Sequence, residues 1–187
     1  RWDNVGAMRN RGVEINVSAD VLRIKDFTWN VNANVSYNKN EITELYNGIT
    51  EYVASDTGRM VAVGHPLGEF YLNRYAGVNP TNGDALWYTK DGEITTEYNE
   101  SDKVMLGKTH EAPWQGGFGT TLSWQGFSLS AQFTWVADRW MLNNDRVFQE
   151  SNGLFSAYNQ SKRMLYDRWK KPGDVTDIPR YGVTPQL

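Results

Sequence analysis

The feature that most constrains this chain is a strict alternation of apolar and polar residues between Gly12 and Asn40. Apolar side chains recur at every second position over Val13–Val21. After the short break LRIKD the alternation resumes over Phe27–Tyr37, with Thr, Asn and Ser between the apolar residues. Successive side chains of a strand point to opposite faces, so each run has one apolar and one polar face. The short break predicts that the two runs form an antiparallel hairpin.

A second pair of alternating runs follows much later in the chain, on either side of the tight turn Gln125-Gly126. Together the two pairs predict four long strands near residues 12–22, 27–39, 116–124 and 127–136. The run Phe27–Tyr37 is about eleven residues long, whereas an ordinary strand has roughly 5–6 and a membrane-crossing strand roughly 9–11. The length of this run therefore favours a strand that crosses a membrane.

The remaining chain forms two long connections, residues 40–115 and 137–187. The first contains two turn signals, NG at 82–83 and DG at 91–92, which flank the short strand ALWYT. The second contains a helical pattern over 156–171, ended by Pro-Gly. Short turns at one end and long connections at the other are typical of outer-membrane barrels. We expect an all-β fold: an antiparallel transmembrane β-barrel segment within a single domain, 1–187, with extracellular loops and one short helix.

The alternative is a soluble β-sandwich, which alternates in the same way and exposes its polar face to water. Two further features favour the membrane. Aromatic residues gather near the strand ends, as interfacial girdles require. The polar faces are dominated by Asn, Ser and Thr rather than by the Lys and Glu of a free surface. A soluble all-β carbohydrate-binding module remains the alternative, and a glycoside hydrolase fragment is a third.

Composition excludes several other classes. The sequence of 187 residues has no cysteine, so it has neither disulfides nor cysteine-based zinc sites. Its formal net charge of -3 argues against a nucleic-acid partner. No run of about 18 apolar residues is present, which excludes a transmembrane helix. The chain opens on Arg1 and ends in the turn-like stretch VTPQL, so we expect a fragment of a longer protein.

No residue pattern indicates catalysis or metal binding. The two histidines, His65 and His110, lie far apart beside Pro-containing turns, and we interpret them as ordinary loop residues. G-x-S-x-G and H-E-x-x-H motifs are absent. The first connection is rich in carboxylates, which we interpret as solvated loop charges: Glu69, Asp84, Asp91, Glu93, Glu97 and Glu100. We therefore expect no enzyme, no cofactor and no metal site.

Aromatic side chains in the connections are the candidates for contact with a substrate or a lid protein. Their flat faces could stack on a sugar, although local packing of the loops would use the same residues. The candidate residues are Trp87, Tyr88, Trp114, Trp140, Phe148 and Tyr158, with Phe155 beside them.

Five blocks of the sequence resemble the C-terminal part of the barrel in SusC/RagA-type TonB-linked outer-membrane transporters. The resemblance spans essentially the whole chain, and the blocks occur in the family's order. They are NRGVEINV at 10–17, FTWNVNANVSYNKNEI at 27–42, VGHPLGEFYLNRYAGVNPTNGDALWY at 63–88, LGKTHEAPWQGGFGTTLSWQGFSLSAQFTW at 106–135, and the helix followed by DRWKKPGDVTDIPRY at 167–181.

The resemblance implies a function that composition and spacing do not show. It implies that the chain supplies about four strands of a roughly 22-stranded plugged barrel in the outer membrane of a Gram-negative bacterium. It further implies import of a nutrient such as an oligosaccharide or a peptide. The implied partners are the TonB complex, acting through parts of the protein outside this sequence, a SusD-like surface lipoprotein, and outer-membrane lipid.

Overall fold

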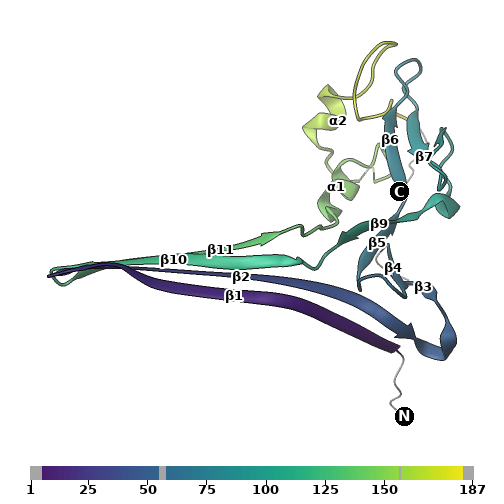
Figure 1. The fold of residues 1–187 in the computed structure, drawn as a ribbon. Coiled ribbons are helices and arrows are strands. Elements are labelled where there is room, and N and C mark those ends of the chain that lie inside the picture. The colour runs from purple at the N-terminus through teal and green to yellow at the C-terminus, as the bar shows by residue number, and fades with distance from the viewer. Residues whose placement is uncertain (1–5, 55–57, 156, 183–187) are drawn as a thin grey trace. The chain divides into compact units, whose positions relative to one another are not determined.

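The computed structural model describes residues 6–54, 58–155 and 157–182, so the turn-like stretch 183–187 lies outside the described residues. Four long strands form one antiparallel sheet in the order β1-β2-β10-β11 (Figure 1). They are β1 (Gly6–Ile24), β2 (Phe27–Leu45), β10 (Trp114–Trp124) and β11 (Phe127–Ala137). The all-β fold with two long hairpins is confirmed. The prediction of a single domain over 1–187 stays a prediction.

The first hairpin is longer than its alternating pattern. Gly6 pairs with Leu45, so β1 and β2 extend beyond the predicted 12–22 and 27–39, and the first connection begins after Leu45 rather than at residue 40. Backbone pairing does not need apolar side chains. In this extension Arg9 and Glu41 face each other across the strands and form an ion pair at 3.0 Å. The alternating pattern therefore predicted only the part of the hairpin that has an apolar face, and missed its extension.

A bulge near the short turn changes which residues occupy the apolar face. Asp20 pairs with Asn30, but the next pair is Leu22 with Trp29, which leaves Val21 as the extra residue. Leu22 therefore takes the place on the apolar face that the alternation had assigned to Val21. Alternation alone cannot show such a shift, because Val21 and Leu22 are both apolar.

The register aligns the apolar side chains of all four strands on one face of the sheet. Val17, Ala33, Phe118 and Phe133 form one such row, in which Val17 is 58% and Phe118 51% exposed. A row of aromatic residues lies at each end: Phe27, Trp124 and Phe127 beside the short turns, and Tyr37 with Trp114 at the other end. Side chains on this face, such as Val17 and Phe118, are exposed, whereas in a sandwich a second sheet would cover them.

The connections contain short strands in two further sheets. The first has the order β3-β4-β5-β9, with β3 (Glu51–Ala54), β4 (Arg59–Ala62), β5 (Glu69–Leu72) and β9 (Val104–Thr109). The second has the order β6-β7-β8, with β6 (Arg74–Val78), β7 (Ala85–Tyr88) and β8 (Ile94–Thr95). β7 is the predicted ALWYT strand, and the adjacent Gly83 and Gly92 both have positive φ, as their turns require.

Two short α-helices are present among the described residues, where one helix was predicted. The predicted helix over 156–171 is limited to α2 (Lys162–Tyr166), whose first turn is capped by the Ser161 side chain. The second helix, α1 (Asn144–Gln149), is capped by Asn143. Both are too short for a clear 3.6-residue pattern, which explains the error. No helix among the described residues has the length and apolar character needed to span a membrane.

By its internal contacts the chain divides into two compact units. Unit 1 comprises residues 1–70 and 107–141, and unit 2 comprises 71–106 and 142–187. In unit 1 a small core of Ile42, Leu45 and Val61 fixes the end of β2. In unit 2 segments from the two long connections bind each other: Arg180 N donates to Gly83 O at 2.9 Å, and the Trp169 indole donates to Pro80 O at 3.1 Å.

Candidate functional site

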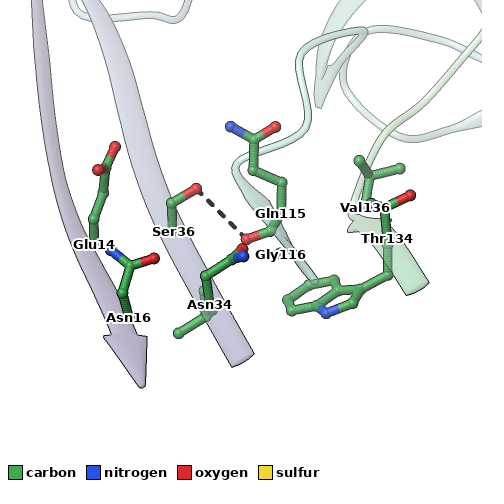
Figure 2. A pocket seen from close by; sticks show the side chains of 10 residues that line it. Glu14, Asn16, Asn34, Ser36, Gln115, Gly116, Thr134 and Val136 are labelled. Atoms are coloured by element: carbon green, nitrogen blue, oxygen red, sulfur yellow. Dashed lines mark hydrogen bonds between the residues drawn. The ribbon is translucent and has the colours of Figure 1, made fainter. Parts of the chain in front are cut away.

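The polar face of the long sheet presents a continuous array of uncharged side chains. The register places Asn16 beside Asn34 and Ser18 beside Asn32. At the end of the sheet a groove of about 450 Å³ is lined by Glu14, Asn34 and Gln115, among others (Figure 2). Ser36 Oγ donates to the backbone oxygen of Gln115 across this groove, at 3.5 Å. The groove therefore offers amide and hydroxyl groups, together with the Glu14 carboxylate, to water or to a polar solute.

Amide side chains on this face fill the space above glycines of β10. A Cβ at Gly119 would lie 2.2 Å from Gln132 Oε1 and 2.9 Å from Asn32 Nδ2. Glycine at this position lets both amides lie close to the backbone of the central strand. The result is a polar surface without charge along β2, β10 and β11, as expected for a hydrated lumen.

On the apolar face the one hydroxyl within the central rows is satisfied internally. Thr120 pairs with Val31 and Ala131, so its side chain lies among apolar neighbours. The Trp29 indole donates a hydrogen bond to Thr120 Oγ1 at 2.9 Å. This bond satisfies two polar groups on a face that is otherwise hydrocarbon, which is what a lipid environment requires.

A buried carboxylate joins three segments of unit 1. Glu69 at the start of β5 is 2% exposed. Its Oε1 accepts a hydrogen bond from Gly107 N at 2.6 Å, and its Oε2 lies 2.9 Å from His65 Nδ1. The interpretation of Glu69 as a solvated loop charge is therefore wrong. The carboxylate at the start of β5 is buried because its two oxygens meet partners on separate segments.

The two histidines have separate contacts within the described part of the chain. His65 pairs with Glu69, and His110 packs its ring over Gly68, where a Cβ would lie 2.3 Å from the ring carbon Cε1. Gly68 has φ +83, so only glycine fits both the backbone conformation and the ring. Within the described ranges no group of three or more His, Asp or Glu residues could hold a metal ion.

Trp87 and Tyr88 are neighbours on β7 with different surroundings. Trp87 makes edge contacts with Tyr75 and Tyr98, with ring centroids 5.2 and 5.1 Å apart. Tyr88 lies beneath the Arg74 guanidinium at 5.3 Å. Burial, reinforced by the Asp177 charge, raises the pKa of Tyr75 to about 12, so this cluster stays neutral at physiological pH.

The structure brings Phe148 and Tyr158 together with Phe155. The Phe148 ring lies 4.9 Å from Phe155 and 5.4 Å from Tyr158, so the three rings form one cluster at the end of α1. Tyr158 is also among the exposed aromatic residues. The rings pack on one another, but Tyr158 is also exposed. The predicted contact of this cluster with a substrate or a lid protein therefore stays a prediction.

Trp114 and Trp140 belong to unit 1. Trp114 packs against Tyr37 at 4.6 Å and so belongs to the aromatic row at the end of the sheet. The Trp140 indole donates to Asp138 Oδ1 at 3.0 Å, and Lys108 Nζ lies 4.5 Å from its ring. The predicted role of all six aromatic residues in substrate or lid contact stays a prediction.

An ionic cluster connects the two short helices, and sequence reasoning missed it. Glu150 accepts from Arg146 at 2.6 Å and from Arg163 at 2.9 Å, and Arg163 also binds Asp177 at 2.7 Å. Burial raises the pKa of Glu150, but the hydrogen bonds and charges of the two arginines outweigh it and hold the pKa below its usual value. Only the i, i+4 spacing of Arg146 and Glu150 could have indicated part of it.

Comparison with known proteins identifies relatives that are much longer than this chain. No protein-family model matches the chain. TonB-dependent receptor P39 of Formosa agariphila is 27% identical over 87% of this chain and 14% of the relative. TonB-dependent receptor SusC of Bacteroides thetaiotaomicron is 31% identical over 56% of this chain and 12% of the relative. The chain spans between 12% and 19% of the length of the curated relatives that it matches.

Solved structures match over the whole chain. The RagAB peptide transporter has a TM-score of 0.92 and 34% identity, covering 100% of this chain and 21% of that chain. The RagAB peptide importer in its open-open state has a TM-score of 0.90 and 35% identity, covering 100% and 20%. These named relatives are receptors and transporters rather than enzymes. The likeness in sequence and in fold identifies this chain as a segment of a SusC/RagA-type TonB-dependent receptor.

Proposed function

We propose that the chain forms part of the wall and surface loops of an outer-membrane transporter that imports a nutrient. The main support is the long sheet, which has one exposed apolar face and one polar face dominated by uncharged side chains, with Glu14 and Asp20 of β1 as exceptions. The apolar face would contact lipid, and the polar face would line the lumen. The long connections would lie outside the cell and receive the substrate.

The spacing of the two aromatic rows supports a membrane position. Phe27 and Tyr37 lie about ten residues apart on β2, which is ~34 Å along the strand at the ~3.4 Å per residue of antiparallel strands. A tilt of ~45° reduces this length to ~24 Å along the membrane normal, close to the ~25 Å apolar band of outer-membrane barrels. A soluble carbohydrate-binding module would not need this spacing and would leave the apolar face in water, so it is disfavoured.

A peptide is the substrate class with the most direct support, because the matching RagAB structures are described as peptide transporters and importers. An oligosaccharide remains the second class from the sequence analysis. The proposed partners are a SusD/RagB-like surface lipoprotein and the TonB complex, the latter through parts of the receptor outside this segment. Uptake of a labelled peptide mixture, compared with labelled oligosaccharides, in cells with and without the receptor would distinguish the two classes.

The membrane position is tested by two neighbouring substitutions with side chains on opposite faces of β1. In the full-length receptor, Val17→Arg places a charge on the apolar face near the middle of the strand, at a cost of roughly 2–4 kcal/mol at the bilayer midplane. Ser18→Arg places the same charge on the polar face and is the matched control. We expect Val17→Arg to lose heat-modifiable receptor from the outer-membrane fraction, and Ser18→Arg to retain it. Equal assembly of both variants would refute the proposal.

A further inference from the structure

Three exposed cations lie beyond the aromatic row that contains Tyr37, and we call them the basic belt: Arg11, Lys39 and Arg139. Arg11 and Lys39 face each other in the register of β1 and β2. Both continue the apolar face, because Arg11 lies two residues before Val13 in β1 and Lys39 lies two residues after Tyr37 in β2. Arg139 follows the end of β11 and lines the same hollow as Lys39 and Tyr37.

The carboxylates near the basic belt already have partners. Glu41 forms its ion pair with Arg9 at 3.0 Å, Asp138 accepts from the Trp140 indole, and Glu111 lies 3.1 Å from His110 Nε2. Within the described part of the chain, no ion pair neutralises any of the three belt cations. Only Glu41 is cancelled by a cation, but the three belt cations outnumber the two other carboxylates, Asp138 and Glu111, so the local charge is positive although the whole sequence has a net charge of -3.

The position of the belt relative to the aromatic row indicates what the anion is. Lys39 lies about two residues beyond Tyr37, which is ~7 Å along the strand and ~5 Å along the membrane normal at a ~45° tilt. Aromatic belts lie at the level of the lipid headgroups. On the apolar face, the charges just beyond this row therefore meet headgroup phosphates rather than the lumen. This step rests on the proposed membrane position.

A hollow of about 570 Å³ adjoins the belt and is lined by Lys39, Arg139 and Tyr37, but also by Glu111 and by Asn38 and Asn40 of the polar face. The belt cations on the apolar face, rather than the hollow as a whole, therefore define the site. Arginine binds phosphate through two parallel hydrogen bonds, and lysine through a compact charge. We propose that the basic belt binds the phosphate groups of an anionic lipid in the leaflet on the side of the long connections.

Lipid binding is tested with the purified full-length receptor in neutral detergent and with hexa-acylated lipid A carrying two phosphates as the probe. Arg11→Gln with Lys39→Gln removes two belt cations. Arg23→Gln with Lys25→Gln removes two cations at the short-turn end of the same hairpin and is the matched control. A cation near a charged membrane surface contributes about a factor of five in binding. We expect the belt variant to bind lipid A about 30-fold more weakly by native mass spectrometry, and the control to bind as the unmodified receptor does.

Heat-modifiable migration separates this inference from the proposed function, because it reports assembly independently of lipid binding. If the belt variant assembles but binds lipid A with unchanged affinity, the inference is overturned. An equal loss of lipid A affinity in the control variant would overturn it as well. Competition by millimolar inorganic phosphate that matches the effect of lipid A would assign the site to free anions instead. If the double variant does not assemble, the single variants Lys39→Gln and Arg139→Gln are measured instead. Each must then weaken lipid A binding about fivefold.

Discussion

The buried carboxylate of Glu69 provides the sharpest test of the packing in unit 1. Replacing it by alanine removes the acceptor for Gly107 N, at 2.6 Å, and the partner of His65 Nδ1, at 2.9 Å. A hydrogen bond to a charged group contributes about 1.5–3 kcal/mol. The His65 contact adds little, because the His65 side chain is 46% exposed and water replaces its partner. The expected cost therefore comes mainly from the bond to Gly107.

Hydrogen exchange measured by mass spectrometry on the full-length receptor detects this loss locally. A cost of about 1.5–3 kcal/mol corresponds to roughly 10- to 150-fold faster exchange at the Gly107 amide in peptides covering β9. Glu69→Gln keeps an oxygen acceptor but loses the charge, so its exchange should lie between those of the alanine variant and the unmodified receptor. Glu111→Ala, at a nearby carboxylate with a side chain that is 72% exposed, is the control and should leave β9 unchanged. Unchanged protection of β9 in Glu69→Ala would refute the reasoning.

Two further predictions concern the loops. Gly68→Ala should destabilise its loop more than Gly64→Ala, because both residues have positive φ but only Gly68 lies against the His110 ring. Hydrogen exchange of this segment should be faster in Gly68→Ala, and a second substitution, His110→Ala, should slow it again. Equal effects of Gly68→Ala and Gly64→Ala would exclude the role of the ring contact. Because the pKa of Glu150 is lowered in the folded state, its ionised form stabilises unit 2 at pH values above the usual pKa of 4.5. This stabilisation is lost as the pH falls through the folded-state pKa. Glu150→Gln should abolish the loss of α1 protection as the pH is lowered from 6 to below 4.5, after correction for intrinsic exchange. A pH response equal to that of the unmodified receptor would contradict the role of Glu150 with Arg163.

Local pattern was sufficient to predict the two hairpins and the short strand β7. In each, the pairing partners are close in sequence, and the turn residues indicate where the chain reverses. The polar and apolar faces were equally predictable, because a period of two fixes the direction of every side chain in a regular strand. The exception was the bulge at Val21, where one extra residue changed the face of those that follow.

The candidate site was less predictable than the wall. The burial of Glu69 depends on Gly107, which is far away in the sequence, and the ionic cluster of Arg163 depends on Asp177 and Glu150. A carboxylate in a Gly-punctuated loop has the same local sequence whether it is solvated or buried. Its state is decided by which distant donors reach it, and no periodicity records that.

The sequence by itself therefore determined the strand type, the two faces and the family likeness, because these follow from the order of side chains along a regular backbone. Only the tertiary structure decided that β2 pairs with β10 across the long first connection, and that segments of both connections bind each other in unit 2. These pairings bring together residues far apart in the chain. They depend on which backbone and side-chain groups find partners when the whole chain folds, and that choice leaves no local mark in the sequence.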